Sequence, residues 1–304
     1  MAKPVLSAKH FHNEEAAYAY VEKRVWPQGP VCPKCGETAR LGKLAGKSTR
    51  IGTYKCYACR KPFTVKVGTI FEDSKVPMYL WLQAMHFMCS GKKGISSNQL
   101  SRVLGVQLNT AWFMSHRIRE AMRSGALAVP MGTGGGIVES DETFIGTKKG
   151  VVKGGGGFRH KMKVHSLVER GGELRSVVVE NVTRKEVETI IAANVSREAT
   201  LMTDTAPYYR KKGFPVADHQ LVNHHAGEYV VGQAHTNTLE GYYSVFKRGM
   251  KGVYQHCAEK HLHRYLAEFD FRYNQRVALG VNDTMRAERA LEGIKGKRLT
   301  YRLA

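Results

Sequence analysis

The chain has 304 residues, with 47 Lys and Arg against 26 Asp and Glu, which gives a formal net charge of +21 at pH 7. Its 42% hydrophobic and 24% charged residues are typical of a globular protein with material for two or more domains, and they exclude a disordered, collagen-like or disulfide-scaffold chain. The longest apolar stretch without a charged side chain, Val76–Gly91, is too short and too polar to span a membrane. The first residues lack the apolar core of a signal peptide. We therefore expect a cytoplasmic protein with no membrane partner.

A positive charge of this size is typical of proteins that contact polyanions, because neutralising phosphates releases counterions. A merely solvated basic surface is the alternative, and charge alone does not exclude it. Two glycine-rich segments, Met131–Gly136 and Gly146–Lys161, indicate a linker and a flexible basic loop. Together with the cysteine pattern they predict three domains, spanning residues 1–70, 71–130 and 131–304.

The first segment contains two C-x-x-C motifs with twenty residues between them. This spacing is typical of a structural Zn²⁺ site with four thiolate ligands. Strand-like sequences at Arg50–Lys55 and Phe63–Val67 extend the prediction to a zinc ribbon, and so short a segment needs the metal to fold. The alternative is two redox-active or unpaired cysteine pairs, which a cytosolic chain without a surrounding βαβ unit disfavours. The four cysteines are Cys32, Cys35, Cys56 and Cys59.

The segment after the ribbon has a helical pattern. A helix over Ile95–Leu104 has Ser96 or Ser97 as its N-cap, Gly105 ends it, and a second helix covers Thr110–Met122. Two helices joined by a glycine-containing turn are typical of a helix-turn-helix DNA reader, although many packed helical hairpins look the same. The residues expected to face DNA are Asn109, His116, Arg117 and Arg119.

Acidic residues recur at the ends of elements in the third segment. We expect Asp141 on a first strand, Asp204 at the end of a fourth strand, and Glu240 on a later helix. Strand parity places Glu139 with Asp141 and Glu142 on the opposite face, and we expect Glu139 and Glu142 to form salt bridges. Several carboxylates from different elements are what a site for two Mg²⁺ ions requires. The predicted elements are strands Ile137–Ile145, Lys163–Val168, Leu174–Val182 and Ala199–Asp204, a helix opened by the capping box Thr183–Glu186, and helices His235–Arg248 and Lys260–Asn274.

Basic residues accompany these acids. Lys247 lies seven residues after Glu240, two helical turns along the same face. The glycine-rich loop is either a mobile hairpin or a grip on backbone phosphates. Its candidate phosphate contacts are Lys148, Lys149, Lys153 and Arg159.

Five segments together give the chain a family resemblance. It resembles the DDE insertion-sequence transposases that have a ribonuclease-H-like catalytic domain, and most of all the bacterial branch with an N-terminal zinc ribbon. The segments are Cys32–Cys59, Ser140–Gly146, Thr203–Asp204, His235–Gly249 and His261–Asn274.

The resemblance implies an α/β fold in which a mixed sheet with flanking helices follows the ribbon and the helical domain. It also implies that Asp141, Asp204 and Glu240 bind catalytic Mg²⁺ or Mn²⁺, and that Lys247, with Arg248, contacts DNA beside the scissile phosphate. Parts of the branch use asparagine as the third catalytic residue, and Asn237 precedes Glu240 by one turn. The pair could also form a capping box. We favour Glu240, because a carboxylate offsets the charge of the ions better than an amide does, and keep Asn237 as an auxiliary residue.

The implied function is transposition. The protein would bind the terminal inverted repeats of its element, cut 3′ ends and join them to target DNA, as a homodimer or larger assembly on double-stranded DNA in the bacterial nucleoid. One rival hypothesis is a non-catalytic DNA-binding regulator that uses the ribbon and the helix-turn-helix. A second rival is a nuclease that hydrolyses DNA without joining it.

Overall fold

The computed structural model describes residues 3–123, 129–152, 158–210, 213–222 and 235–300. The chain forms two compact units, one made of Met1–Arg123 with Val277–Ala304 and the other of Ser124–Arg276. None of the helices in the described ranges is long and apolar enough to cross a membrane.

The first unit combines a small antiparallel sheet, in the order β1-β2-β3, with a group of helices. Of the expected strand Phe63–Val67, only Phe63 pairs with a neighbouring strand of the ribbon, as the last residue of β3. The chain then turns through Gly68, whose φ is +74°. The elements are η1 (Val5–Ser7), η2 (Lys9–Phe11), α1 (Glu14–Val25), β1 (Leu41–Lys43), β2 (Tyr54–Cys56), β3 (Pro62–Phe63), α2 (Met78–Ser90), α3 (Ser97–Leu104), α4 (Leu108–Met122), η5 (Val277–Leu279) and α8 (Asp283–Glu292).

Local signals set the ends of α3 as the sequence predicts. The Ser96 side chain accepts a hydrogen bond from the backbone of Gln99, and Gly105 follows the helix in the left-handed conformation at φ +65°. The structure therefore confirms this helix and its break.

The C-terminal segment, which the sequence placed with the third domain, packs on the helices of the first unit. Helix α8 lies against α1, α2 and α4. Arg286 donates to the carbonyl of Cys89 at the end of α2, and Lys297 donates to the carbonyls of Ala121 and Arg123 at the end of α4. These cations satisfy carbonyls that have no partner within their own helices, which ties the segment to this unit.

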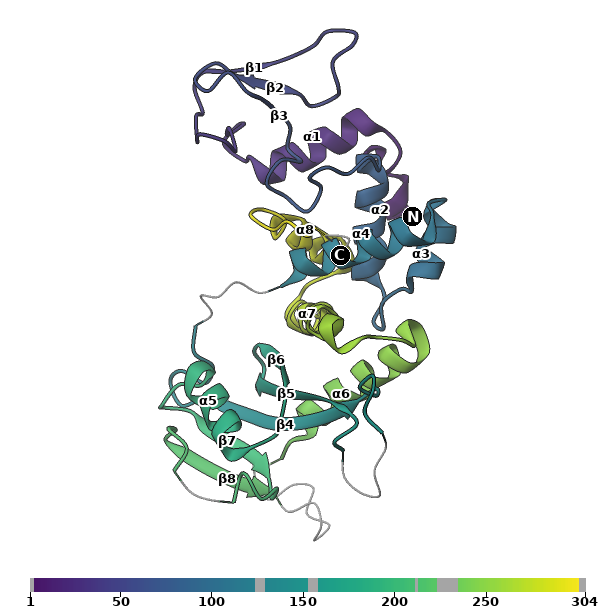
Figure 1. The fold of residues 1–304 in the computed structure, drawn as a ribbon. Coiled ribbons are helices and arrows are strands. Elements are labelled where there is room, and N and C mark those ends of the chain that lie inside the picture. Colours follow the sequence, from purple (N-terminus) through teal and green to yellow (C-terminus); the bar gives the residue numbers. More distant parts are fainter. Residues whose placement is uncertain (1–2, 124–128, 153–157, 211–212, 223–234, 301–304) are drawn as a thin grey trace. The chain divides into compact units, whose positions relative to one another are not determined.

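The second unit is built on a five-stranded mixed sheet in the order β6-β5-β4-β7-β8 (Figure 1). Strands β4, β5 and β6 form an antiparallel meander, whereas β7 runs parallel to β4 and β8 runs parallel to β7. This arrangement confirms the expected α/β fold with a ribonuclease-H-like mixed sheet and flanking helices. The elements are β4 (Ile137–Ile145), β5 (Met162–Glu169), β6 (Leu174–Val179), α5 (Arg184–Asn194), β7 (Thr200–Asp204), β8 (Asp218–Val222), α6 (Asn237–Gly249), the π-helical segment η4 (Met250–Tyr254) and α7 (Glu259–Asn274).

The two faces of this sheet carry separate apolar layers. On one face, α5 packs Val187 and Ile191 against Val138, Leu167 and Leu201. The other face is covered by α6 and α7, so the odd-numbered residues of β4 point toward α6. The buried residues of this second layer include Ile145, Val164, Val168, Leu239, Phe246, Leu262 and Phe269.

Candidate catalytic and metal centres

The parallel pairing of β4 with β7 brings two predicted acids to one edge of the second unit. Glu139 on β4 is the register partner of Met202 on β7. Two residues further along, each strand carries an aspartate, Asp141 on β4 and Asp204 at the last position of β7. Because residues two apart share a face, both carboxylates project toward the α6 side of the sheet. Tyr243 of α6 donates to the carbonyl of Asp141 at 2.6 Å, which holds the helix beside this strand.

The acids of β4, β7 and α6 influence the protonation of Asp141. Burial raises the pKa of Asp141 well above its usual range, and the negative charges of Glu142, Asp204 and Glu240 raise it further. A divalent cation would relieve this repulsion, and carboxylate oxygens are the donors that Mg²⁺ prefers. The donor set therefore fits the ions that the sequence predicts.

The two aspartates are oriented by the backbone that follows them. The amide of Glu142 donates to Oδ1 of Asp141 at 2.7 Å, and the amide of Ala206 donates to Oδ1 of Asp204 at 2.9 Å. Among the described residues, only the four ribbon cysteines bring three or more ligand atoms within 4.8 Å of one another. The carboxylate oxygens of Asp141, Asp204 and Glu240 therefore do not all lie within 4.8 Å of one another.

Glu240 and Asn237 both lie in the exposed first turn of α6. The N-cap of this helix is Thr236, and its side chain makes no capping hydrogen bond. The capping-box alternative is therefore wrong for this helix, because the amides at its start are satisfied by a residue of β4.

That residue is Glu139, whose side chain is 0% exposed. Its carboxylate accepts from the backbone amides of Thr238 at 3.1 Å and Leu239 at 3.2 Å, and from the Thr238 hydroxyl at 2.8 Å. Arg170 donates to the same carboxylate at 2.8 Å, and Nδ1 of His235 lies 3.2 Å away. The expected salt bridge of Glu139 is confirmed, with Arg170 as its partner. The same carboxylate also binds the backbone amides at the start of α6, the helix that carries Glu240. A buried carboxylate at a helix N-terminus fixes that terminus and complements its dipole.

Replacing Glu139 by Leu should lower the free energy of unfolding by about 3–5 kcal/mol, because Arg170 and the first amides of α6 lose a buried charged partner. Glu139→Gln keeps an acceptor oxygen and should cost less. Urea denaturation measures both. Glu173→Leu is the matched control, since Glu173 is largely exposed and pairs only with Arg175, so about 0–1 kcal/mol is expected. Equal losses for Glu139→Leu and Glu173→Leu would contradict the anchoring role.

A polar network that the sequence did not predict lies on the opposite face of β4. Glu142 forms the expected salt bridge, with Nδ1 of His165 at 2.9 Å, and also accepts from the hydroxyls of Tyr208 and Tyr209. Ser140 hydrogen-bonds to Tyr209 at 2.8 Å. The only sequence signal for this network is a strand that carries polar residues on both faces. The network holds a negative charge directly behind Asp141.

Three of the four expected DNA contacts on α4 are buried, and the prediction that this helix exposes them is wrong. His116 is 0% exposed, Arg117 4% and Arg119 1%, whereas Asn109 is exposed. Arg117 donates to the carbonyls of Ile70 and Glu72 at 2.7 Å, Arg119 donates to Ser115, and the His116 ring packs against Trp112. Arg117 thus connects α4 to the backbone of another segment, and none of the three side chains faces solvent.

Arg117→Met should therefore lower stability by about 1.5–3 kcal/mol, the usual contribution of hydrogen bonds made by a charged group, and leave the salt dependence of DNA binding unchanged. Thermal unfolding and DNA titrations at several salt concentrations test both parts. The control is Arg102→Met on α3, where the exposed side chain predicts a change within about 0.5 kcal/mol. A stable Arg117→Met protein that had lost DNA affinity would restore Arg117 as a contact residue.

The basic residues of the second unit differ in their surroundings. Lys148 forms an ion pair with Glu259 at 2.6 Å, while Lys149 and Arg159 are exposed and Lys153 lies outside the described residues. On α6, Lys247 is half-buried with its ammonium 6.0 Å from the centre of the Tyr243 ring. The adjacent Arg248 is exposed and donates to the carbonyl of Ser244 at 3.0 Å.

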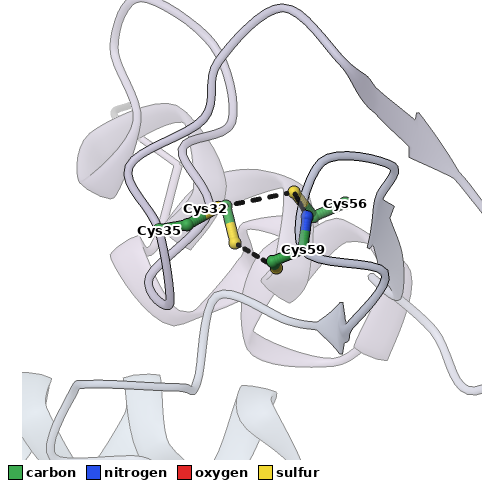
Figure 2. Close-up of side chains that lie close together, drawn as sticks. All are labelled: Cys32, Cys35, Cys56 and Cys59. Atoms are coloured by element: carbon green, nitrogen blue, oxygen red, sulfur yellow. Dashed lines mark hydrogen bonds between the residues drawn. The ribbon is translucent and has the colours of Figure 1, made fainter.

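The ribbon of the first unit brings its four cysteine sulfurs together (Figure 2). The Sγ atoms of Cys32 and Cys59 lie 3.7 Å apart, and those of Cys35 and Cys56 lie 3.6 Å apart. Tetrahedral zinc with Zn–S bonds of about 2.3 Å places its sulfurs about 3.8 Å apart. The cluster therefore fits a structural Zn²⁺ ion held by two knuckles.

Comparisons with known proteins agree with this domain order. Residues 12–62 match the family model of the transposase zinc-ribbon domain, and residues 134–274 match that of the ISXO2-like transposase domain. A protein of Halobacterium salinarum, described as an uncharacterized protein in transposable element ISH50, is 26% identical over 284 residues, which cover 88% of this chain and 93% of the relative. The structure of a pre-cleavage Mos1 transpososome is a remote likeness, with a TM-score of 0.29 and 12% identity over 64% of this chain and 70% of that chain.

The two family matches confirm the predicted resemblance to DDE insertion-sequence transposases with an N-terminal zinc ribbon. The segments that match the two expected domains follow one another in the expected order.

Proposed function

We propose that this chain, which carries a transposase zinc ribbon and an ISXO2-like transposase domain, is a DNA transposase that cleaves the ends of an insertion sequence and joins them to target DNA. One observation carries the proposal. Asp141 of β4 and Asp204 of β7 share the face of the sheet that α6 covers, and burial raises the pKa of Asp141, as do the charges of Glu142, Asp204 and Glu240. Repulsion of this kind among neighbouring carboxylates is typical of a site that binds divalent cations.

Asp141, Asp204 and Glu240 are the residues that would hold two Mg²⁺ or Mn²⁺ ions. When bound, such ions activate an attacking oxygen and stabilise the charge on the leaving oxygen of a phosphodiester. The protein contributes the positioning. Backbone amides orient the two aspartates, and Glu139 fixes the start of the helix that presents Glu240.

Cationic and amide side chains on α6 complete the proposed site. Lys247, two turns beyond Glu240, would bind a phosphate beside the scissile bond, with Arg248 next to it on the exposed surface. Asn237 lies one turn before Glu240 and could donate to the substrate as an auxiliary group.

In this proposal the first unit recognises the terminal inverted repeats, through the ribbon and the exposed Asn109 of α4. The net charge of +21 supports double-stranded DNA as the partner, in the nucleoid of the cell. Joining two ends to one target requires two active sites, so we infer a homodimer or a larger assembly on DNA.

The test uses oligonucleotide duplexes that end in the terminal repeats of the element, incubated with the full chain and Mg²⁺ or Mn²⁺. The proposal expects 3′-end cleavage followed by products joined to a target duplex, and no reaction in EDTA. Cleavage without joined products would favour the nuclease, and metal-independent binding without cleavage would favour the DNA-binding regulator.

A further inference from the structure

A cavity of about 950 Å³ lies in the second unit, beyond the end of β4. One side is formed by Phe144–Thr147, Lys149, Lys161 and Met162, and the other by the end of α6 with the connection through η4 to α7. Its chemically distinctive residues are four lysines and one histidine: Lys149, Lys161, Lys247, Lys251 and His256.

The lining carries an excess of positive charge. Glu259 is the one acidic residue among the lining residues, and the ion pair with Lys148, at 2.6 Å, offsets its charge. In the part of the chain that the structure describes, Lys149, Lys161 and Lys251 form no ion pair with an acidic side chain. Unpaired ammonium groups that converge on a cavity favour an anionic occupant.

The floor of the cavity is apolar. Ile145, Met162 and Met250 are buried there, and the ring of Phe144 at its edge stacks on Phe158 with centroids 4.4 Å apart. A compact inorganic anion would leave such a floor uncovered. A ligand with phosphates along one side and sugars or bases along the other matches both surfaces.

The cavity lies within a few nucleotides of the acids. Ile145 is four residues beyond Asp141 on β4, a distance of about 13 Å at 3.3 Å per residue. Lys247 is seven residues beyond Glu240 on α6, about 10 Å along the helix. The rise of about 3.4 Å per base step runs along the helix axis, and neighbouring phosphates of one strand lie about 6–7 Å apart through space, so these distances correspond to about two nucleotides.

We propose that this cavity binds the phosphodiester backbone of the DNA strand about two nucleotides from the scissile phosphate. The inference rests on the proposed function, because the acids define where the scissile phosphate lies. The lysines contact phosphates, and the apolar floor accepts the sugars between them. Its role is to set which bond of the strand reaches the carboxylates.

The test compares the full chain with the double variant Lys161→Ala/Lys251→Ala. Both side chains are at least partly exposed, so the fold should be retained. Loss of two phosphate contacts should reduce the slope of log affinity against log salt by about 1.8. A second set of duplexes replaces single phosphates by neutral methylphosphonates. Substitution about two nucleotides from the cleaved bond should weaken binding by the wild-type chain and have little further effect on the variant.

Lys185→Ala/Arg197→Ala is the matched control, because it removes two exposed cations at α5 and the segment that follows it, away from the cavity lining. It should keep the methylphosphonate profile of the wild type. If the cavity variant keeps both the slope and the profile while the wild type cleaves and joins DNA, the cavity proposal is wrong and the proposed function stands. If no protein cleaves DNA but the profile still depends on Lys161 and Lys251, the proposed function fails and the DNA contact remains. Competition by millimolar inorganic phosphate without any methylphosphonate effect would identify a simple anion site and overturn the proposal.

Discussion

Replacing Asp141 by Asn is expected to abolish DNA cleavage and strand transfer while making the metal-free protein more stable. Loss of one carboxylate removes ion binding that supplies several kcal/mol to the transition state, so the rate should fall on the order of 10³-fold or more. Asp204→Asn should have a similar effect on the rate. Product formation on end-containing duplexes, measured at saturating Mg²⁺, tests the loss.

The stability gain follows from the pKa of Asp141. Burial and the neighbouring charges of Glu142, Asp204 and Glu240 raise this pKa in the folded chain. Below the pKa that Asp141 has in the unfolded chain, its protonated side chain contributes fully to the free energy of folding. This contribution is lost as the pH rises through the higher pKa that Asp141 has in the folded chain. Asn carries no charge at any of these pH values. The melting temperature of the metal-free variant should thus exceed that of the wild type at neutral pH, and Mg²⁺ should stabilise the wild type more.

The matched control for both measurements is Asp218→Asn, which makes the same chemical change on the neighbouring strand β8. Asp218 is exposed and accepts a hydrogen bond from Gln220. Its replacement should leave the reaction rate and the Mg²⁺-dependent stabilisation unchanged. An Asp141→Asn protein with full strand-transfer activity would show that the catalytic site lies elsewhere.

Removal of zinc is expected to unfold the ribbon. Two of the three buried apolar residues of its small core are cysteines of the cluster, Cys32 and Cys56, and Phe63 is the third. Three short strands with so little buried surface do not fold without a metal, and structural zinc in small domains contributes about 10–16 kcal/mol at pH 7. Chelation or Cys56→Ser should therefore release one zinc ion per chain and expose Trp26, which packs against Phe63. Metal analysis, thiol titration and tryptophan fluorescence measure these changes.

Cys257→Ser provides the control, because this thiol belongs to the second unit and is half-buried away from the cluster. It should change neither the zinc content nor the fluorescence. A purified chain with no zinc and two disulfides within the C-x-x-C motifs would favour the redox interpretation of the cysteines.

Features set by neighbouring residues could be predicted closely. The strand Ile137–Ile145 has the bounds that its β-branched pattern indicated, and the Thr183 side chain caps α5 by accepting from the amide of Glu186. The C-x-x-C spacing predicted the cysteine cluster because each knuckle is a local turn. Helices α1 and α8 and strand β8 were missed, although Asn13 and Asn282 cap the two helices by accepting from the amides of Ala16 and Met285.

The amino-acid sequence by itself determined the order of domains, the thiolate cluster and the positions of the three acids along the chain, because short-range spacing encodes each of these. Only the tertiary structure decided that the basic side chains of α4 turn inward, because the carbonyls of Ile70 and Glu72 that attract Arg117 come from a separate segment. It also decided the partner of Glu139. Strand parity placed this carboxylate beside Asp141, but its contact with the start of α6 exists only because the chain returns to β4 about a hundred residues later.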